Sequence, residues 1–328
     1  AILAGLLPNA FGLAAMQRPQ QAYSYQVVCN LPRGDSGVNY AGEGIPEMLT
    51  WGPTAFTVAP DGSYWIADAV TNRLLQFDSG CSLAQVIDLA GITIVPSDIE
   101  VSGNALWVLD AAAVAPAVHR LNANGQGQSR HEIPAGMLEG LSGIALGENG
   151  QLLLEREAGA RLANLGEGRG NQAFNEQAGY TAAGRTYQAR PADLTAIENN
   201  AGTLQFGDRQ VEVRTANDLG GLYYLGFDRQ GSPYVVAEEV VVDNEVTRVD
   251  QTVRKYDATG TLLGIARAPL AEQYTYVEHS LAIGPDGNVY ALLTRAEGAQ
   301  IVRLDFAASL SAILPAEDAA ALDQVSPV

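Results

Sequence analysis

Polar side chains recur at one position of a repeated apolar pattern, directly after its second apolar run. The six residues at this position are Asp68, Asp110, Arg156, Asp208, Glu238 and Thr294. Calcium takes about six to eight oxygen ligands in proteins, many of them from carboxylates. If the equivalent positions converge, the four acids predict a Ca²⁺ site made of Asp68, Asp110, Asp208 and Glu238. The alternative is that these residues cap strands, accept hydrogen bonds from neighbouring segments or face water. Arg156 favours this alternative, because its charge would neutralise nearby acids.

A second polar set precedes the first apolar run of each copy, at Thr54, Ser97, Ser142, Asp193, Tyr223 and His279. Next to it, Glu278-His279-Ser280 contains an acid, a base and a hydroxyl. Consecutive side chains on a strand point to opposite faces, so this triplet cannot form the mutual hydrogen bonds of a catalytic triad. A partner for His279 must come from another copy of the repeated pattern. The candidates for hydrolytic chemistry are therefore Asp193, Glu278 and His279, and the alternative for His279 is a hydrogen-bonded structural role.

The sequence lacks several common catalytic motifs. It contains no GxSxG, phosphate loop, HExxH or dinucleotide fingerprint. The two cysteines, Cys29 and Cys81, fit no CxxC or Cys/His metal pattern, which argues against zinc. Both lie in strand-like stretches that could run side by side at the outer edge of a sheet. In an oxidising compartment they would form a disulfide, and the alternative is a pair of buried thiols.

The elements that must position these residues form a repeat. Each copy is an apolar strand, a Gly/Asn/Asp turn and a second apolar strand, as in FTVAPDGSYWIAD at 56–68. The intervals between turn markers are 42, 46, 52, 29 and 56 residues, for Gly62, Asn104, Gly150, Gly202, Gly231 and Gly287. A four-stranded propeller blade takes about 40–50 residues, and stacked blades cover one another's faces. We therefore predict an all-β fold, a six-bladed β-propeller, with the blade near Gly202 reduced.

One copy carries a more specific pattern. Asp68 is followed by Asn72-Arg73-Leu74, Phe77-Asp78 and Gly80. This arrangement resembles the NHL-repeat family of propellers, and the resemblance extends in a generic form over residues 54–314. It implies a six-bladed toroid, and members of that family serve as scaffolds, ligand binders, lyases and lactonases. The metal-dependent lactonases of similar fold use a Glu, Asn and Asp set around a central divalent ion. Here the axial acids are Asp193 and Glu278, without an aligned Asn.

Composition and the amino-terminal sequence indicate where the protein works. The net charge is −18 over 328 residues, and an acidic surface repels phosphate backbones, which argues against a nucleic-acid partner. Residues 1–15 are apolar and uncharged, and they resemble the core of a secretory signal without its basic beginning. Three interpretations are open: a signal-like remnant, a segment packed on its own propeller, or a segment docked on a neighbouring copy. We expect a secreted, extracellular or periplasmic protein without a membrane span in the mature chain.

The sequence divides into an apolar tail at 1–20, a propeller at 21–315 and an acidic tail at 316–328. Two segments compete to close the ring. SLSAILP at 309–315 resembles the fourth strand of the first blade. SYQVVCNL at 24–31 would be an extra edge strand or the fourth strand of an incomplete blade. The sequence leaves the closure open.

The segment 159–193 interrupts the repeat with a stretch rich in Gly, Ala, Asn and Gln. A long connection in a compact domain is either functional or disordered. We predict an interaction surface from its four arginines and from two tyrosines that precede the last blade, namely Arg161, Arg169, Arg185, Arg190, Tyr274 and Tyr276. Such a surface would bind the acidic face of a neighbour or an anionic ligand, and the alternative is a plain surface loop.

These patterns favour an exported, non-enzymatic binding or assembly module. Its partners would be other protein chains, including copies of itself bound through the amino-terminal tail. It would need no cofactor, or Ca²⁺ alone. The alternative is a Ca²⁺-dependent hydrolase or lactonase at the mouth of the central channel, acting through Asp193, Glu278 and His279.

Overall fold

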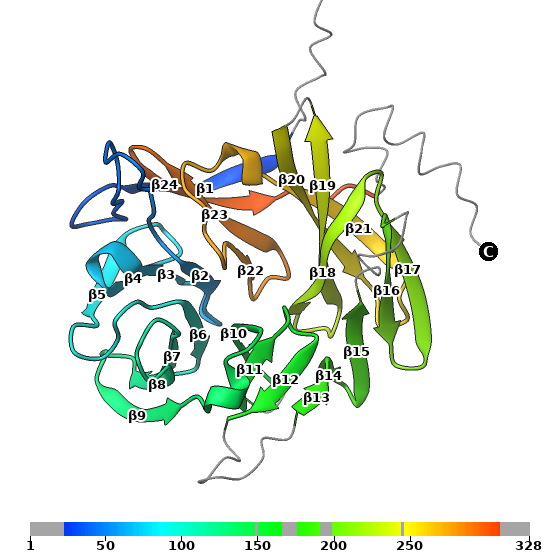
Figure 1. The fold of residues 1–328 in the computed structure, drawn as a ribbon, viewed down its shortest axis with the longest axis horizontal. Coiled ribbons are helices and arrows are strands. Elements are labelled where there is room, and N and C mark those ends of the chain that lie inside the picture. Colours follow the sequence, from blue (N-terminus) through cyan, green and yellow to red (C-terminus); the bar gives the residue numbers. More distant parts are fainter. Residues whose placement is uncertain (1–22, 148–149, 166–175, 191–198, 244–245, 309–328) are drawn as a thin grey trace, which may run out of the picture.

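The computed structural model describes residues 23–147, 150–165, 176–190, 199–243 and 246–308. Their strands form six four-stranded antiparallel sheets arranged in a ring (Figure 1). The predicted six-bladed β-propeller is confirmed. Within the described ranges the helical elements are three short 3₁₀ turns, η1 (Ala69–Thr71), η2 (Ala135–Met137) and η3 (Leu270–Glu272). None of the described residues belongs to a helix that is long and apolar enough to span a membrane.

The blades follow one another along the chain. Blade 1 consists of β2 (Ala55–Val58), β3 (Tyr64–Asp68), β4 (Arg73–Phe77) and β5 (Leu83–Asp88). Blade 2 consists of β6 (Asp98–Ser102), β7 (Ala105–Asp110), β8 (Ala117–Asn122) and β9 (Gly127–Glu132). Blade 3 consists of β10 (Leu141–Leu146), β11 (Leu152–Arg156), β12 (Arg161–Asn164) and β13 (Glu176–Ala178).

The second half repeats this order. Blade 4 consists of β14 (Tyr180–Ala182), β15 (Arg185–Arg190), β16 (Ala201–Phe206) and β17 (Arg209–Arg214). Blade 5 consists of β18 (Asp218–Phe227), β19 (Pro233–Asp243), β20 (Val246–Tyr256) and β21 (Leu262–Ala268). Blade 6 consists of β22 (Leu281–Ile283), β23 (Val289–Arg295), β24 (Gly298–Leu304) and the amino-terminal β1 (Tyr25–Pro32).

The amino-terminal strand closes the ring. β1 pairs antiparallel with β24, from Tyr25 opposite Leu304 to Pro32 opposite Gly298. It is therefore the fourth strand of blade 6, which decides between the two segments that the sequence left in competition. Residues 309–315 lie outside the described residues. The predicted disulfide is confirmed, since Cys29 on β1 is bonded to Cys81 in the β4–β5 turn with 5.5 Å between their Cα atoms. It joins the last blade to the first.

Apolar side chains between adjacent blades form the core. Buried Phe56 and Ile66 of blade 1 pack in one cluster with Leu292 of blade 6. Around blade 4 an aromatic cluster is built from edge-to-face rings, among them Tyr187 against Tyr224 with centroids 5.9 Å apart. The alternating patterns of the strands supply these side chains, because one face of each sheet meets the next blade.

Blade 4 differs from the arrangement expected from its sequence. Gly202 is not a turn residue but lies inside β16, opposite Val213 of β17. The inner hairpin of this blade is β14–β15, whose first strand has three residues. The segment 159–193 is also not one long connection, because it contains β12, β13, β14 and β15. These strands are short and polar, so their apolar alternation was too weak to be recognised.

Candidate functional site in the central channel

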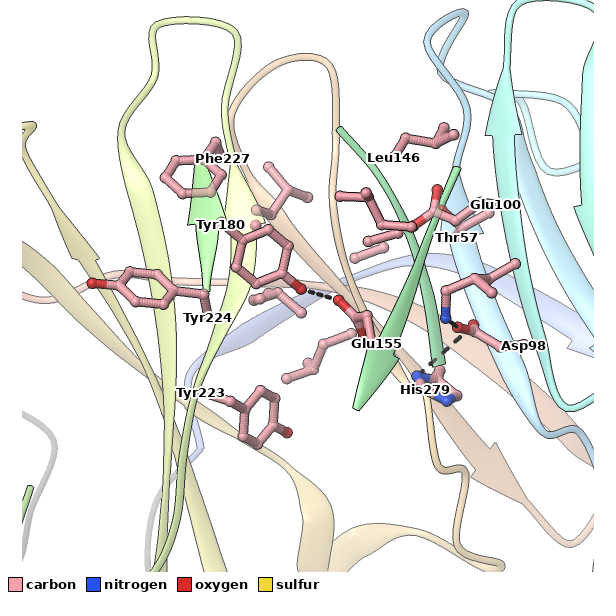
Figure 2. A pocket seen from close by; sticks show the side chains of 18 of the residues that line it. Thr57, Asp98, Glu100, Leu146, Glu155, Tyr180, Tyr223, Tyr224, Phe227 and His279 are labelled. Carbon is pink, nitrogen blue, oxygen red and sulfur yellow. Dashed lines mark hydrogen bonds and ion pairs between the residues drawn. The ribbon is translucent and has the colours of Figure 1, made fainter. Parts of the chain in front are cut away.

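A cavity of about 1050 Å³ occupies the central channel. The innermost strand of every blade contributes to its wall, from β2 and β6 through β10, β14 and β18 to β22. Acidic and aromatic side chains are concentrated in this wall, as Figure 2 shows. The acids among the lining residues are Asp98, Glu100, Glu155, Asp228, Glu238 and Glu278.

A glycine on β10 allows a second-strand glutamate to reach the channel. Gly143 lies opposite Glu155 of β11, directly after a register shift between Leu141 and Gly143. A Cβ added at Gly143 would stand 2.8 Å from Asp98 Oδ2, 3.0 Å from His279 Cε1 and 3.1 Å from Glu155 Oε2. Three side chains from three blades therefore converge on a space that exists because Gly143 has no side chain.

Asp98 links two blades at the edge of this space. Its Oδ1 accepts a hydrogen bond from the Ile99 N–H at 2.8 Å, and its Oδ2 accepts one from the Ile144 N–H at 2.8 Å. His279 Nδ1 lies 3.8 Å from Asp98 Oδ1 (Figure 2). Burial raises the pKa of Asp98 above its usual value, although the neighbouring His279 and the two N–H groups oppose the rise. The contact provides His279 with an acidic partner from another blade.

Two glutamates beside Asp98 hold their protons unusually tightly. Burial, together with the charge of Asp98, raises the pKa of Glu100 to about 8. Burial, with Asp98 and Glu100 nearby, also raises the pKa of Glu155 well above its usual value. The Tyr180 hydroxyl donates a hydrogen bond to Glu155 Oε1. Removing water from a carboxylate disfavours its charged form, so these two carboxyl groups stay protonated to a higher pH than exposed ones.

Blade 5 presents a similar group. Gly221 on β18 lies opposite Glu238 of β19, again directly after a register shift. Glu238 Oε1 accepts a hydrogen bond from Gln251 Nε2 at 3.0 Å, and the Tyr223 hydroxyl lies 3.4 Å from the same oxygen. Gln251 is 7% exposed, and its Oε1 is buried without a hydrogen-bond partner. Burial and the neighbouring Glu238 raise the pKa of Tyr223 well above its usual value, so its hydroxyl remains a donor.

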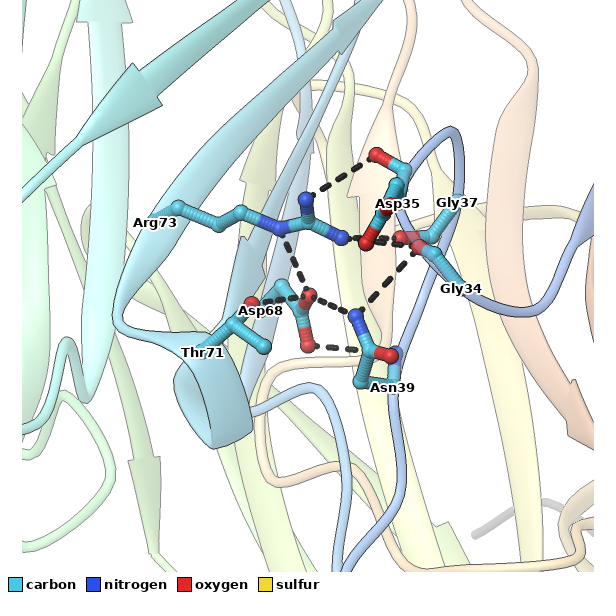
Figure 3. A network of polar contacts seen from close by, with 7 residues as sticks. All are labelled: Gly34, Asp35, Gly37, Asn39, Asp68, Thr71 and Arg73. Carbon is cyan, nitrogen blue, oxygen red and sulfur yellow. Dashed lines mark hydrogen bonds and ion pairs between the residues drawn. The ribbon is translucent and has the colours of Figure 1, made fainter.

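The structure does not bring the four predicted calcium ligands together. Asp68 is fully buried and accepts hydrogen bonds from Asn39, Thr71 and Arg73, the last at 3.0 Å (Figure 3). Arg73 also donates to the carbonyl oxygens of residues 34, 35 and 37. Asp68 therefore fixes the chain segment that leads into blade 1.

The strand-closing position has the same role in other blades. Asp110 accepts hydrogen bonds from the Ile94 and Val95 N–H groups ahead of β6. Arg156 donates to the Glu139 carbonyl ahead of β10, and Thr294 exchanges hydrogen bonds with Thr275 ahead of β22. This agrees with the alternative that these residues cap strands and bind neighbouring segments.

Two of the four predicted calcium ligands, Glu238 and Asp208, do not occupy the strand-closing position that the sequence pattern assigned to them. In blade 5 the residue equivalent to Arg156 is Glu239, which accepts hydrogen bonds from Asn217, whereas Glu238 faces the channel. Asp208 is exposed and lies in the β16–β17 turn rather than after a second strand. Within the described part of the chain, no group of three or more His, Cys, Asp or Glu side chains has the arrangement of a metal site.

The structure places two of the three predicted catalytic residues in the channel. Glu278 and His279 both line the cavity, while Asp193 lies outside the described residues. His279 also joins blade 6 to blade 1, because its carbonyl accepts a hydrogen bond from the Phe56 N–H at 2.9 Å. A catalytic role for Glu278 and His279 stays a prediction.

Most residues of the predicted interaction surface have partners within the chain. Arg161 pairs with Glu157 at 3.5 Å, and Arg185 donates to the Ala258 carbonyl at 2.7 Å. Arg190 donates to Gln188, and the Tyr274 hydroxyl donates to Glu43. Tyr276 is 69% exposed and lines the channel, and Arg169 lies outside the described residues. Binding to another chain through these residues stays a prediction.

The residues predicted from the sequence did not include Asp98, Glu100, Glu155 and Gln251. A signal was present in the inner strands, where Gly143 and Gly221 interrupt apolar runs in LSGI and LGGL. A glycine inside a strand often marks a bulge or a close approach. To predict which glutamate lies opposite each glycine, one must know the register between the two strands. The local sequence does not determine this register.

Comparison with known proteins gives no family. No protein-family model matches the chain, and no curated protein matches it in sequence. A streptogramin B lyase structure is 14% identical with a TM-score of 0.42, covering 82% of this chain and 97% of that chain. A member of the DUF4221 family from Bacteroides vulgatus is 11% identical with a TM-score of 0.48, covering 88% and 100%. The PQQ-bound aldose sugar dehydrogenase from Streptomyces coelicolor is 10% identical with a TM-score of 0.45, covering 88% and 100%. Such distant likenesses carry no argument about function.

Proposed function

We propose that this protein is an exported, non-enzymatic binding module that holds a small ligand in its central channel. The observation that carries the proposal is the cavity of about 1050 Å³, whose wall combines half-buried carboxylates, a buried glutamine and several aromatic rings. Cavities of about 300–1000 Å³ with a few convergent polar groups are typical of small-molecule sites. A scaffold without a ligand could fill its channel with side chains.

A channel-filling variant tests this function. Thr57 lies on β2 in the cavity wall, so Thr57→Trp adds bulk to the channel, whereas Thr247→Trp adds the same ring to an exposed position of β20. The probes are spermidine, glucose and succinate, titrated by calorimetry. We expect at least one probe to bind at one site per chain and to lose at least about tenfold affinity in Thr57→Trp alone. Absence of binding by all three, or equal binding by both variants, contradicts the proposal.

A hydrolase is the second candidate, and the Asp98–His279 contact is the observation that favours it. A carboxylate that orients a histidine is a recurring part of general acid–base sites. Incubation with a panel of lactones and esters, followed by mass spectrometry, separates the two functions. The binding proposal expects intact probes. Product that forms with the wild type and disappears in His279→Gln establishes the enzyme instead.

An oxidising location outside the cytoplasm is also part of the proposal. The Cys29–Cys81 disulfide supports it, because such bonds persist mainly in exported proteins. Fractionation followed by thiol labelling under denaturing conditions provides the test. We expect the protein in an exported fraction with both cysteines protected. Cytoplasmic protein with two reactive thiols contradicts this location.

We further propose that copies of the chain associate through residues 1–15, and that blade 1 is an NHL-type repeat. The apolar composition of residues 1–15 supports the first proposal, and the Asp68–Arg73 network supports the second. Deletion of residues 1–15 should reduce the mass measured by light scattering. An unchanged monomer mass before and after deletion contradicts the association.

A further inference from the structure

A glycine on the innermost strand lies opposite a glutamate on the second strand in two blades of the ring. In blade 3 the pair is Gly143 opposite Glu155, and in blade 5 it is Gly221 opposite Glu238. In both blades the glycine follows a register shift, and a Cβ there would stand close to the glutamate carboxylate, 3.1 Å for Gly143 and 2.7 Å for Gly221. Glu155 on the second strand of blade 3 and Glu238 on the second strand of blade 5 therefore both reach the same cavity. Blade 4 lies between these two blades.

Each glutamate contacts the hydroxyl group of a tyrosine. This group is neutral, so it does not compensate a negative charge on the carboxylate. Tyr180 donates to Glu155 Oε1, and the Tyr223 hydroxyl lies 3.4 Å from Glu238 Oε1 (Figure 2 shows Tyr180, Glu155 and Tyr223). Among the residues that the structure describes, no arginine or lysine forms an ion pair with either glutamate. Arg229 also lines the cavity, but it lies in the β18–β19 turn and donates to the Pro60 carbonyl at 3.0 Å.

Gln251 is an independent sign that a hydrogen-bond donor is missing. Its Nε2 is used by Glu238 at 3.0 Å and by the Tyr223 hydroxyl at 3.3 Å. Its Oε1 is buried and lacks a partner, although the residue lines the cavity and is only 7% exposed. A buried acceptor without a partner is unfavourable, so a ligand that donates a hydrogen bond to Gln251 Oε1 would be stabilised by this contact.

We propose that the channel binds a linear organic diamine or polyamine, with one ammonium group at Glu155 and Asp98 and another at Glu238 and Gln251 Oε1. This inference rests on the proposed function and specifies the ligand of the same cavity. An ammonium group offers three donors and no acceptor, which matches a wall that presents acceptors at both ends. The rings of Tyr180, Tyr223 and Tyr276 provide surfaces for the methylene chain and for cation–π contacts.

Calorimetry with matched probes tests the ligand class. The probes are 1,4-diaminobutane, spermidine, 1-aminobutane, 1,4-butanediol and succinate, each titrated at near-physiological salt so that attraction to the acidic surface is screened. We expect one site per chain for the diamine and spermidine, affinity at least about tenfold lower for the monoamine, and no binding of the diol or succinate. Binding of the diol or succinate in preference to amines overturns the diamine while leaving the proposed function intact.

Charge-removing variants locate the two anchors. Glu155→Gln and Glu238→Gln should each weaken the diamine by about 10- to 100-fold, because each removes one charge-assisted hydrogen-bonding partner. Asp208→Asn removes an exposed charge that is not part of the cavity wall and should leave the affinity unchanged. Circular dichroism and the thermal midpoint of each variant establish that it is folded. Equal diamine affinity in all three folded variants shows that amines bind only to the surface and overturns the inference.

Discussion

Gly221 lies opposite Glu238 in the β18–β19 ladder, and a methyl group at Gly221 would stand 2.7 Å from Glu238 Oε2. Real Cβ contacts of this length are essentially absent, so the carboxylate would have to move. It is the far end of a flexible side chain, which makes the movement inexpensive. The glycine therefore controls the position of a channel carboxylate and contributes little to the stability of the blade.

Gly221→Ala is expected to displace Glu238 from the channel without unfolding the protein. Diamine affinity should fall about tenfold, while the free energy of unfolding changes by less than about 1.5 kcal/mol. Calorimetry and urea denaturation measure the two quantities. Gly127→Ala is the matched control, because an added Cβ there meets no atom within 4 Å. A variant that binds as tightly as the control would show that Glu238 does not anchor the ligand.

Glu100 makes stability depend on pH. Its pKa is about 8 in the folded protein against an ordinary value of 4.5, so the folded state binds more protons between these values. The stability that this group contributes is complete below pH 4.5 and is lost as the pH rises to about 8. Glu100→Gln should therefore stabilise the protein relative to the wild type by about 1–2 kcal/mol more at pH 9 than at pH 5. Urea denaturation at both pH values measures this difference, and exposed Glu297→Gln should show none.

Diamine binding should also tighten with pH. The amines stay protonated up to about pH 9, whereas the carboxyl group of Glu100 ionises only as the pH approaches about 8. Burial also raises the pKa of Glu155 well above its usual value, so its ionisation is delayed to higher pH. Ionised carboxylates attract ammonium groups more strongly, so the dissociation constant should decrease from pH 6 to pH 8.5. Titrations in buffers of different ionisation enthalpy should also show proton release. A dissociation constant that does not change over this range would exclude the protonated carboxyls from the site.

The Asp68–Arg73 pair is expected to stabilise the first blade strongly. The Asp68 side chain is 0% exposed and that of Arg73 is 12% exposed, and breaking a buried pair leaves a charge without compensation. Arg73→Ala should cost about 3–5 kcal/mol of unfolding free energy. The exposed pair of Arg130 and Glu132 provides the control, because Arg130→Ala should cost about 1 kcal/mol or less. Similar losses in the two variants would mean that the Asp68 network has no special role.

The disulfide should stabilise the closed ring. Cys29 and Cys81 are separated by 52 residues, and closing a loop of that length contributes about 3–4 kcal/mol in the chain-entropy model. The double variant Cys29→Ser/Cys81→Ser should lose this amount in urea denaturation. Reduction of the wild type should produce the same loss. If neither treatment shifts the unfolding transition, pairing of β1 with β24 alone is sufficient to close the propeller.

The sequence by itself determined the architecture, while it left the two cysteines open between a disulfide and a pair of buried thiols. Apolar couplets such as 56–68 and 281–294, each with a Gly, Asn or Asp turn, require antiparallel hairpins, and six of them at blade spacing predict the ring. This information is local, because turn chemistry and period-two alternation are expressed within a few residues. It became weak in blade 4, where short polar strands hid the register and Gly202 was mistaken for a turn.

Only the tertiary structure decided what the channel contains. Whether Glu155 or Arg156 faces the axis depends on a register shift beside Gly143, and a shift of one residue reverses the face of every side chain beyond it. Asp98, Glu155 and His279 are far apart in the sequence and meet because blades 2, 3 and 6 surround one axis. Cross-strand register and ring closure are properties of long-range pairing, and for this reason the spacing of the residues could not reveal the site.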